Sequence, residues 1–349
     1  VPDRPEAWLL TAARNTAANG RRSQGVRDLA AGEVEQRLYG PETGDNDFPD
    51  ERLKLLFVCA HPAIDAGMRT PLMLQTVLGL DATRIAQAFA VEPATMGQRL
   101  VRAKAKIRDA GIRFAVPDPG ALSERFADVL DAVYGAFGTG WDGPAEAGVE
   151  EDLAEEALYL GRLLVDLLPR EPEAKGLLAL MLYCHARRAA RFTPDGQFVP
   201  LADQDARLWS RPLIVEAEGL LTTASRAGRF GRYQCEAAIQ SVHIQRPITG
   251  QTNHEAIALL YRMLAASSPT LGVLVAQAAA LLEAGQPLDA LLALDAIMAP
   301  RKETYQPYWV VRCLALIRTG QTETAALARH RAIALTRDRR LLSHVARMV

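Results

Sequence analysis

The sequence predicts an all-α protein in which a small helix-turn-helix domain precedes a large helical C-terminal domain with repeats. Three observations lead to this prediction. Alanine and leucine are abundant, aromatic residues make up only 6% of the chain, and runs of β-branched residues are scarce, which favours helix over sheet. Apolar residues recur with helical spacing over long stretches. A glycine–glutamine pair also returns at a constant interval near the end of the chain.

The first predicted helix spans residues 5–22. Pro5 suits a first helical turn, Trp8 and nearby alanines give the helix an apolar side, and its other side is polar and basic. So short a helix does not bury its apolar side alone and needs a partner. The chain starts at Val1, close to this helix, so we expect that its natural N-terminal part is missing.

Helical periodicity runs, with breaks, over residues 51–113 and resumes at Ala121, after a break that holds Pro117 and Pro119. We expect further interruptions at Gly138–Gly140 and at residues 192–200. The predicted organisation is a remnant helix at 1–30, a turn-rich linker at 31–50, a compact domain at 51–116, a helical region at 121–245 and repeats at 246–349.

Three glycine–glutamine pairs, beginning at Gly250, Gly285 and Gly320, lie 35 residues apart. An alanine follows each glycine after five or six residues: Ala256, Ala290 and Ala325. A two-helix unit of about 34 residues is typical of tetratricopeptide repeats, in which the glycine closes the turn and the alanine lets two helices approach closely. Such an array presents a surface for a peptide or protein partner.

Charge is unevenly distributed along the chain, although the net charge is only −1. Residues 94–113 hold six basic residues and one acidic residue, whereas residues 149–175 hold eight acidic and three basic residues. A basic block followed by an acidic one indicates two different roles.

Other sequence features argue against several classes of protein. The four cysteines are far apart and none lies in a CxxC pair, which is typical of reduced, buried thiols in a cytoplasmic protein. The sequence holds no apolar run long enough to span a membrane, and we expect no secretory leader. His254-Glu255 lacks the second histidine of a metalloprotease motif, because residue 258 is alanine. Cys59 with His61, and Cys184 with His185, are isolated pairs. We therefore expect no enzyme, no metal and no cofactor.

The basic block belongs to a predicted helix-turn-helix. Asp81 suits the N-cap of a short helix, and Pro93 suits the first turn of a second helix that runs to Arg108. The connection between the two helices is short. Two helices, a tight turn and a basic second helix are typical of a DNA-binding helix-turn-helix.

A helical wheel divides the second helix into a core side and an outer side. The core stripe holds Met96, Leu100, Ala103 and Ile107. The opposite face holds Ala94, Gln98, Val101, Arg102 and Ala105. Arg99 and Lys106 lie on one flank, and Lys104 and Arg108 on the other. Small outer residues allow close approach to a groove, Gln98 and Arg102 can reach base edges, and the flanking cations can meet phosphates.

Four segments resemble extracytoplasmic-function (ECF) sigma factors of the group with a tetratricopeptide-containing C-terminal extension. Residues 94–106 are similar to the recognition helix of sigma region four, and residues 50–63 to the entry of that domain. Residues 201–209, ending at Trp209, resemble a motif of the extension, and residues 5–15 resemble the end of sigma region two. Arg84 and Gly97 depart from the usual family residues. The resemblance to region two begins only near its end, so we expect that most of region two is missing.

The resemblance implies an ECF-type sigma factor that directs RNA polymerase to promoters. Region four would read the upstream element of promoter DNA and touch the β flap of the RNA polymerase core, region two would grip its clamp, and the extension would modulate activity. The expected DNA-binding residues are Thr95, Gln98, Arg99, Arg102, Lys104, Lys106 and Arg108, with Arg14, Asn15, Arg21 and Arg22 from the first helix.

Two other interpretations remain open. The chain fits a helix-turn-helix transcriptional regulator with a tetratricopeptide-type sensory or protein-interaction domain. It also fits a tetratricopeptide scaffold whose basic helix is incidental. Binding to RNA polymerase distinguishes the sigma factor from both, and strongly salt-dependent DNA binding distinguishes the first two from the scaffold.

Overall fold

A computed structural model describes residues 50–89, 91–111, 119–142, 149–298 and 302–336. Within these residues the regular secondary structure is helical, and the one β feature is an isolated bridge between Phe192 and Phe198. The all-α prediction is therefore confirmed. The predicted helix at 5–22 and residues 31–49 of the predicted linker lie outside the described residues. The chain divides into two compact units, residues 1–167 and 168–349.

The described part of unit 1 consists of six helices: α3 (Glu51–Cys59), α4 (Ala66–Thr76), α5 (Ala82–Ala88), α6 (Pro93–Asp109), α7 (Pro119–Asp142) and α8 (Val149–Leu167). Local capping explains where several of them begin. The Asp81 carboxylate accepts hydrogen bonds from the backbone N–H groups of Thr83 (2.8 Å) and Arg84 (2.9 Å). Pro93 occupies the first turn of α6. Both predictions are confirmed.

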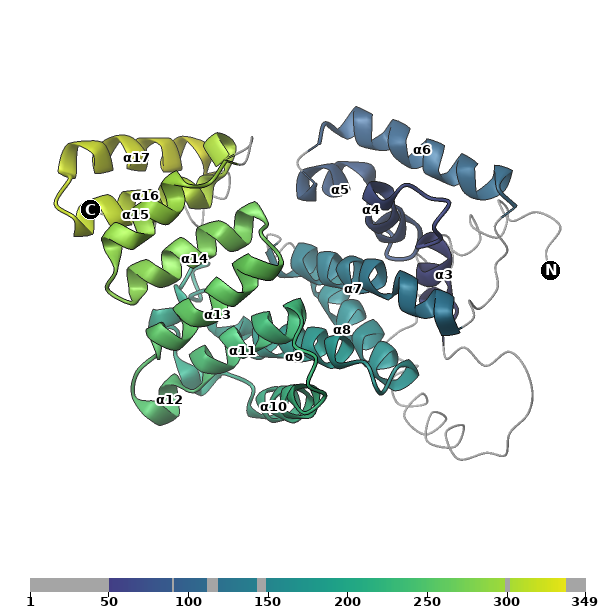
Figure 1. Cartoon of the computed structure of the whole chain (residues 1–349), viewed down its shortest axis with the longest axis horizontal. Helices are drawn as coiled ribbons and strands as arrows, with labels where there is room; N and C mark the ends of the chain where they lie inside the picture. Colours follow the sequence, from purple (N-terminus) through teal and green to yellow (C-terminus); the bar gives the residue numbers. More distant parts are fainter. Residues whose placement is uncertain (1–49, 90, 112–118, 143–148, 299–301, 337–349) are drawn as a thin grey trace. The chain divides into compact units, whose positions relative to one another are not determined.

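Helices α7 and α8 pack on the helices that precede them (Figure 1). Arg69 of α4 forms an ion pair with Asp128 of α7 at 2.8 Å, and Arg52 of α3 pairs with Glu156 of α8. Arg125 of α7 donates to the backbone carbonyl of Phe57 at 3.1 Å. The compact unit therefore extends to residue 167, whereas the sequence placed the start of the extension at residue 121.

The predicted interruption at Gly138–Gly140 is wrong, because α7 continues to Asp142. Phe137 and Val133 are buried, which holds this part of the helix in place against its neighbours. The Thr139 hydroxyl donates back to the Gly135 carbonyl at 2.8 Å within the helix. Tertiary packing thus outweighs the low helix propensity of the two glycines.

Unit 2 contains helices α9 (Pro172–Ala186), α10 (Arg211–Ser225), α11 (Arg232–Ile244), α12 (Arg246–Thr249), α13 (His254–Ser267), α14 (Leu271–Glu283), α15 (Pro287–Asp295), α16 (Gln306–Arg318) and α17 (Thr322–Leu335). Short 3₁₀ turns occur at Arg188–Ala190, Leu201–Asp203, Ala206–Leu208 and Lys302–Thr304. Successive helices from α13 to α17 pack against each other and share one apolar core (Figure 1). The predicted break at residues 192–200 is confirmed by the absence of an α-helix there.

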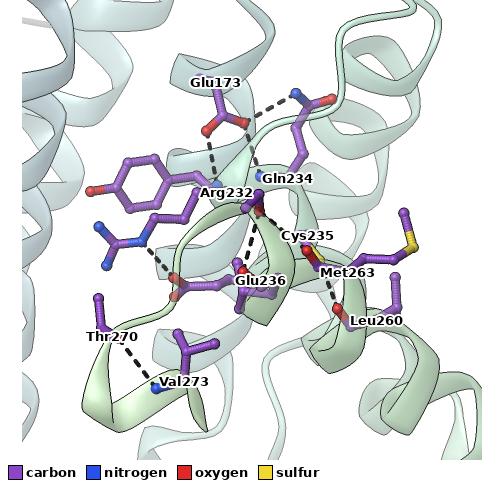
Figure 2. Close-up of polar contacts among 12 residues, drawn as sticks. Glu173, Arg232, Gln234, Cys235, Glu236, Leu260, Met263, Thr270 and Val273 are labelled. Atoms are coloured by element: carbon purple, nitrogen blue, oxygen red, sulfur yellow. Dashed lines mark hydrogen bonds and ion pairs between the residues drawn. The ribbon is translucent and has the colours of Figure 1, made fainter. Parts of the chain in front are cut away.

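Helix α9 caps the N-terminus of α11 across space. The Glu173 carboxylate accepts from the backbone N–H groups of Tyr233 (2.9 Å) and Gln234 (3.1 Å), and from the Gln234 side-chain amide (3.1 Å), as Figure 2 shows. A Cβ atom at Gly231 would overlap this carboxyl group, and one at Gly176 would lie 2.7 Å from the Gln234 backbone nitrogen. Two glycines therefore allow α9 and α11 to pack closely.

The glycine–glutamine pairs lie at turns between helices. Gly285 and Gly320 both have φ 78°, and the N–H group of the following glutamine bonds the carbonyl five residues earlier, at 2.9 Å in each turn. This is the Schellman ending of a helix, which favours glycine. Ala290 and Ala325 are buried as expected, but Ala256 is only half-buried. In the Gly250 unit, the neighbouring Ile257 and Ala258 are buried instead.

Candidate nucleic-acid interface

Helix α6 is anchored by one apolar stripe. Met96 and Leu100 are each 1% exposed, Ala103 is buried and Ile107 is half-buried, which matches the predicted core side. The helix lies against α4 and α5 (Figure 1), and the buried stripe faces the core of this unit. Because the core side is fixed, the face of α6 from which every other side chain projects is fixed as well.

All seven predicted DNA-contacting residues of α6 are exposed: Thr95, Gln98, Arg99, Arg102, Lys104, Lys106 and Arg108. Among the described residues, the side chains of Gln98, Arg99, Arg102 and Lys106 have no hydrogen bond or ion pair. Arg52 and Arg69 of the same unit differ, since both pair with carboxylates. The free cations of α6 thus remain available to an external anion.

Three of these cations lie together in a shallow groove. Arg99, Arg102, Ala103 and Lys106 line its α6 side. The other side is lined by residues of the α3–α4 connection and the start of α4: Ala63, Ile64, Asp65, Gly67 and Met68. The wheel placed Arg102 on the outer face, and the structure also brings it beside Arg99 and Lys106. Asp65 lies in the same groove, where its carboxylate accepts from the Gly67 backbone N–H at 3.0 Å.

The opposite flank of α6 has a different environment. Partial burial lowers the pKa of Lys104, which lies close enough to the buried Cys59 for the two groups to interact electrostatically. Arg108 forms an exposed ion pair with its neighbour Asp109 at 3.1 Å. These two cations are therefore less available than the three in the groove, although the sequence treated both flanks alike.

Two features of this surface escaped the sequence analysis. Val101 is 67% exposed on the outer face of α6, and it was not counted among the contact residues. The groove itself was missed because residues 63–68 come near α6 only through the tertiary fold. Arg14, Asn15, Arg21 and Arg22 lie outside the described residues.

The residues set aside as isolated pairs do not assemble into a metal site. Across the described ranges, no group of three or more histidine, cysteine or acidic side chains is placed to hold a metal ion. Burial raises the pKa of the Cys59 thiol to about 12. No helix in the described part of the chain has both the length and the apolar character needed to cross a membrane.

Comparison with known proteins gives two matches. Residues 125–225 match a family described as a family of unknown function, DUF6596. The chain is 39% identical over 349 aligned residues to the uncharacterized protein R00370 of Rhizobium meliloti (strain 1021), an alignment that covers 96% of this chain and 81% of that protein. No solved structure matches the chain.

Proposed function

We propose that this chain, which belongs to the same family as the Rhizobium meliloti protein R00370, acts as an ECF-type sigma factor without enzymatic activity. The α3–α6 helices would read the upstream element of a promoter as duplex DNA. The same unit would contact the RNA polymerase core, in the cytoplasm. The unit 2 helices would modulate this activity or bind a protein partner.

One observation carries the proposal: three cations, on the outer face and one flank of α6, have no partner within the described residues. Arg99, Arg102 and Lys106 are exposed and converge on one groove, while Met96 and Leu100 lock the helix orientation. Exposed basic residues on the second helix of a helix-turn-helix match the phosphate and base-edge contacts made in a major groove. In a basic helix whose charge is incidental, we would not expect three unpaired cations to line the same groove.

The packing of α7 and α8 supports a role for the C-terminal extension in the same process. The DUF6596 match begins at residue 125, within α7, and α7 contacts α3 and α4 directly. Arg69–Asp128 and Arg52–Glu156 join the two parts by charge. The extension therefore begins inside the proposed DNA-binding unit, where it can support the position of α4 and α6.

Salt-dependent DNA binding tests the proposal. When a substitution removes one contact between a basic side chain and a phosphate, the slope of log K against log salt becomes shallower by about 1. Arg99→Gln and Lys106→Gln should each show this change. Arg207→Gln is the matched control, because Arg207 is exposed, lies in unit 2 and pairs with Asp205 at 2.7 Å. Equal slopes in all four proteins would contradict DNA binding by α6.

Binding to RNA polymerase core separates a sigma factor from a regulator. The full chain should co-sediment with purified bacterial core enzyme. The complex should also bind the promoter DNA that the chain selects. If the chain binds DNA with the expected salt slope but never associates with core enzyme, the sigma-factor proposal is wrong and a helix-turn-helix regulator replaces it.

A further inference from the structure

The outer face of α6 contains one large apolar side chain among polar and small ones. Val101 is 67% exposed, and on the helix it lies between Gln98, one turn earlier, and Ala105, one turn later. The large apolar residues Met96 and Leu100 point into the core of unit 1. A valine that is two-thirds exposed contributes little to the packing of this unit and has a lower helix propensity than alanine.

The surroundings of Val101 fit a DNA groove better than a protein partner. Gln98, one turn earlier, and Arg102, the next residue, are exposed and without an internal partner among the described residues, and the exposed Lys104 lies one turn later. A single apolar side chain surrounded by basic and polar ones has too little apolar area to bind a hydrophobic protein surface. It matches a major groove, where phosphates line the walls and the thymine C5-methyl group is the apolar feature of the floor.

We propose that Val101 is a specificity-determining residue that contacts the C5-methyl group of a thymine in the DNA site. This inference rests on the proposed function, because it requires α6 to enter a major groove. Gln98 lies one turn away on the same face and is placed to pair with an adenine edge. Small residues at Ala94 and Ala105 leave room for the backbone of α6 to come near the bases.

Replacement of thymine by uracil tests this contact, because it removes only the methyl group. The probe is a duplex enriched from a random DNA pool by the full-length chain, in which each thymine is replaced singly. For the natural chain, one replacement should weaken binding about fourfold, which corresponds to one buried methyl group. In Val101→Ala the same replacement should have no effect, because the contact is already lost.

Val215→Ala is the matched control, since Val215 is 58% exposed on α10 of unit 2. This variant should keep the full sensitivity to uracil at the same position. If Val101→Ala also keeps that sensitivity, or if no single thymine matters to the natural chain, Val101 does not read a methyl group and the inference is overturned. The salt-dependent binding described above would survive that result. Failure to bind or enrich any DNA would instead overturn the proposed function and this inference together.

Discussion

The Glu173 carboxylate lies 3.1 Å from the backbone nitrogen of Gln234, so that the first turn of α9 serves as the N-cap of α11 (Figure 2). Gly231, at the N-cap position itself, has no side chain to offer. Gln234 is 1% exposed, so water does not replace a lost partner easily. The contact therefore joins two helices and satisfies buried donors at the same time.

Replacing Glu173 by alanine should destabilise unit 2 by about 2–3 kcal/mol, because buried N–H groups lose a charged acceptor. Hydrogen exchange of the α11 amides, followed by mass spectrometry, should accelerate in this variant. Glu283→Ala is the control: its ion pair with Arg318 is about half exposed, and its loss should cost less than about 1 kcal/mol. Similar losses in both variants would contradict the capping role.

Two glycine-to-alanine substitutions should change stability in opposite directions. Gly176→Ala places a methyl group against the Gln234 backbone and should cost about 1–3 kcal/mol by forcing α9 and α11 apart. Gly219→Ala meets nothing within 4 Å in α10 and should stabilise by about 1 kcal/mol through helix propensity. Urea denaturation followed by circular dichroism measures the free energy of unfolding of both variants. If both substitutions stabilise the protein, the close contact at Gly176 does not prevent an alanine there.

Acid should weaken unit 2 through His243. Burial lowers the pKa of His243 to about 4, and the nearby positive charges of Arg187, His254 and Arg246 add to this effect. The unfolded chain, with an ordinary pKa near 6.5, binds the proton first, so stability is complete above about pH 6.5 and is lost as pH falls towards 4. The loss from this group should reach at most about 3 kcal/mol.

The pH effect is measured by urea denaturation at about pH 5 and pH 7.5, values that bracket the ordinary histidine pKa. His243→Gln should show a smaller stability difference between the two pH values than the natural chain. His330→Gln, at an exposed position of α17, should retain the natural difference. An unchanged difference in His243→Gln would assign the acid sensitivity to other groups.

A chain ending at Leu167 should fold, whereas one ending before Pro119 should not. The shorter chain loses α7 and α8 and with them the partners of Arg52 and Arg69, and it leaves the faces of α3 and α4 that those helices cover open to water. Circular dichroism melting should show a cooperative transition for residues 1–167 only. A cooperative transition of the shorter chain would mean that α7 and α8 are dispensable for the fold.

The sequence was sufficient for features that depend on neighbouring residues. The Asp81 cap, the Pro93 start and the buried Met96–Leu100 stripe follow from local rules, and the structure has all three. The Glu173 cap was not predictable, because its partners lie about sixty positions away. The break expected at Gly138 failed for the same reason, since packing of α7 outweighs local propensity.

In the candidate site, too, local features could be predicted from the sequence and features of the tertiary fold could not. Exposure of the cations on α6 followed from helical periodicity, and each of them is exposed. Their unequal surroundings did not follow, because Lys104 nears Cys59 and Arg99 nears residues 63–68 only when α3, α4 and α6 are assembled. The tetratricopeptide assignment of the repeats stays a prediction, although Gly285 and Gly320 close equivalent turns.

The ion pairs Arg69–Asp128 and Arg52–Glu156 also restrict how such proteins can exchange parts during evolution. Recombination in the stretch just before α7 would give a daughter protein whose α3 and α4 lack matching partners. A crossover between α8 and α9 keeps both partners of each ion pair in the segment from the same parent. A fusion that replaces the helices after α8 should therefore keep both ion pairs when it joins near residues 168–171.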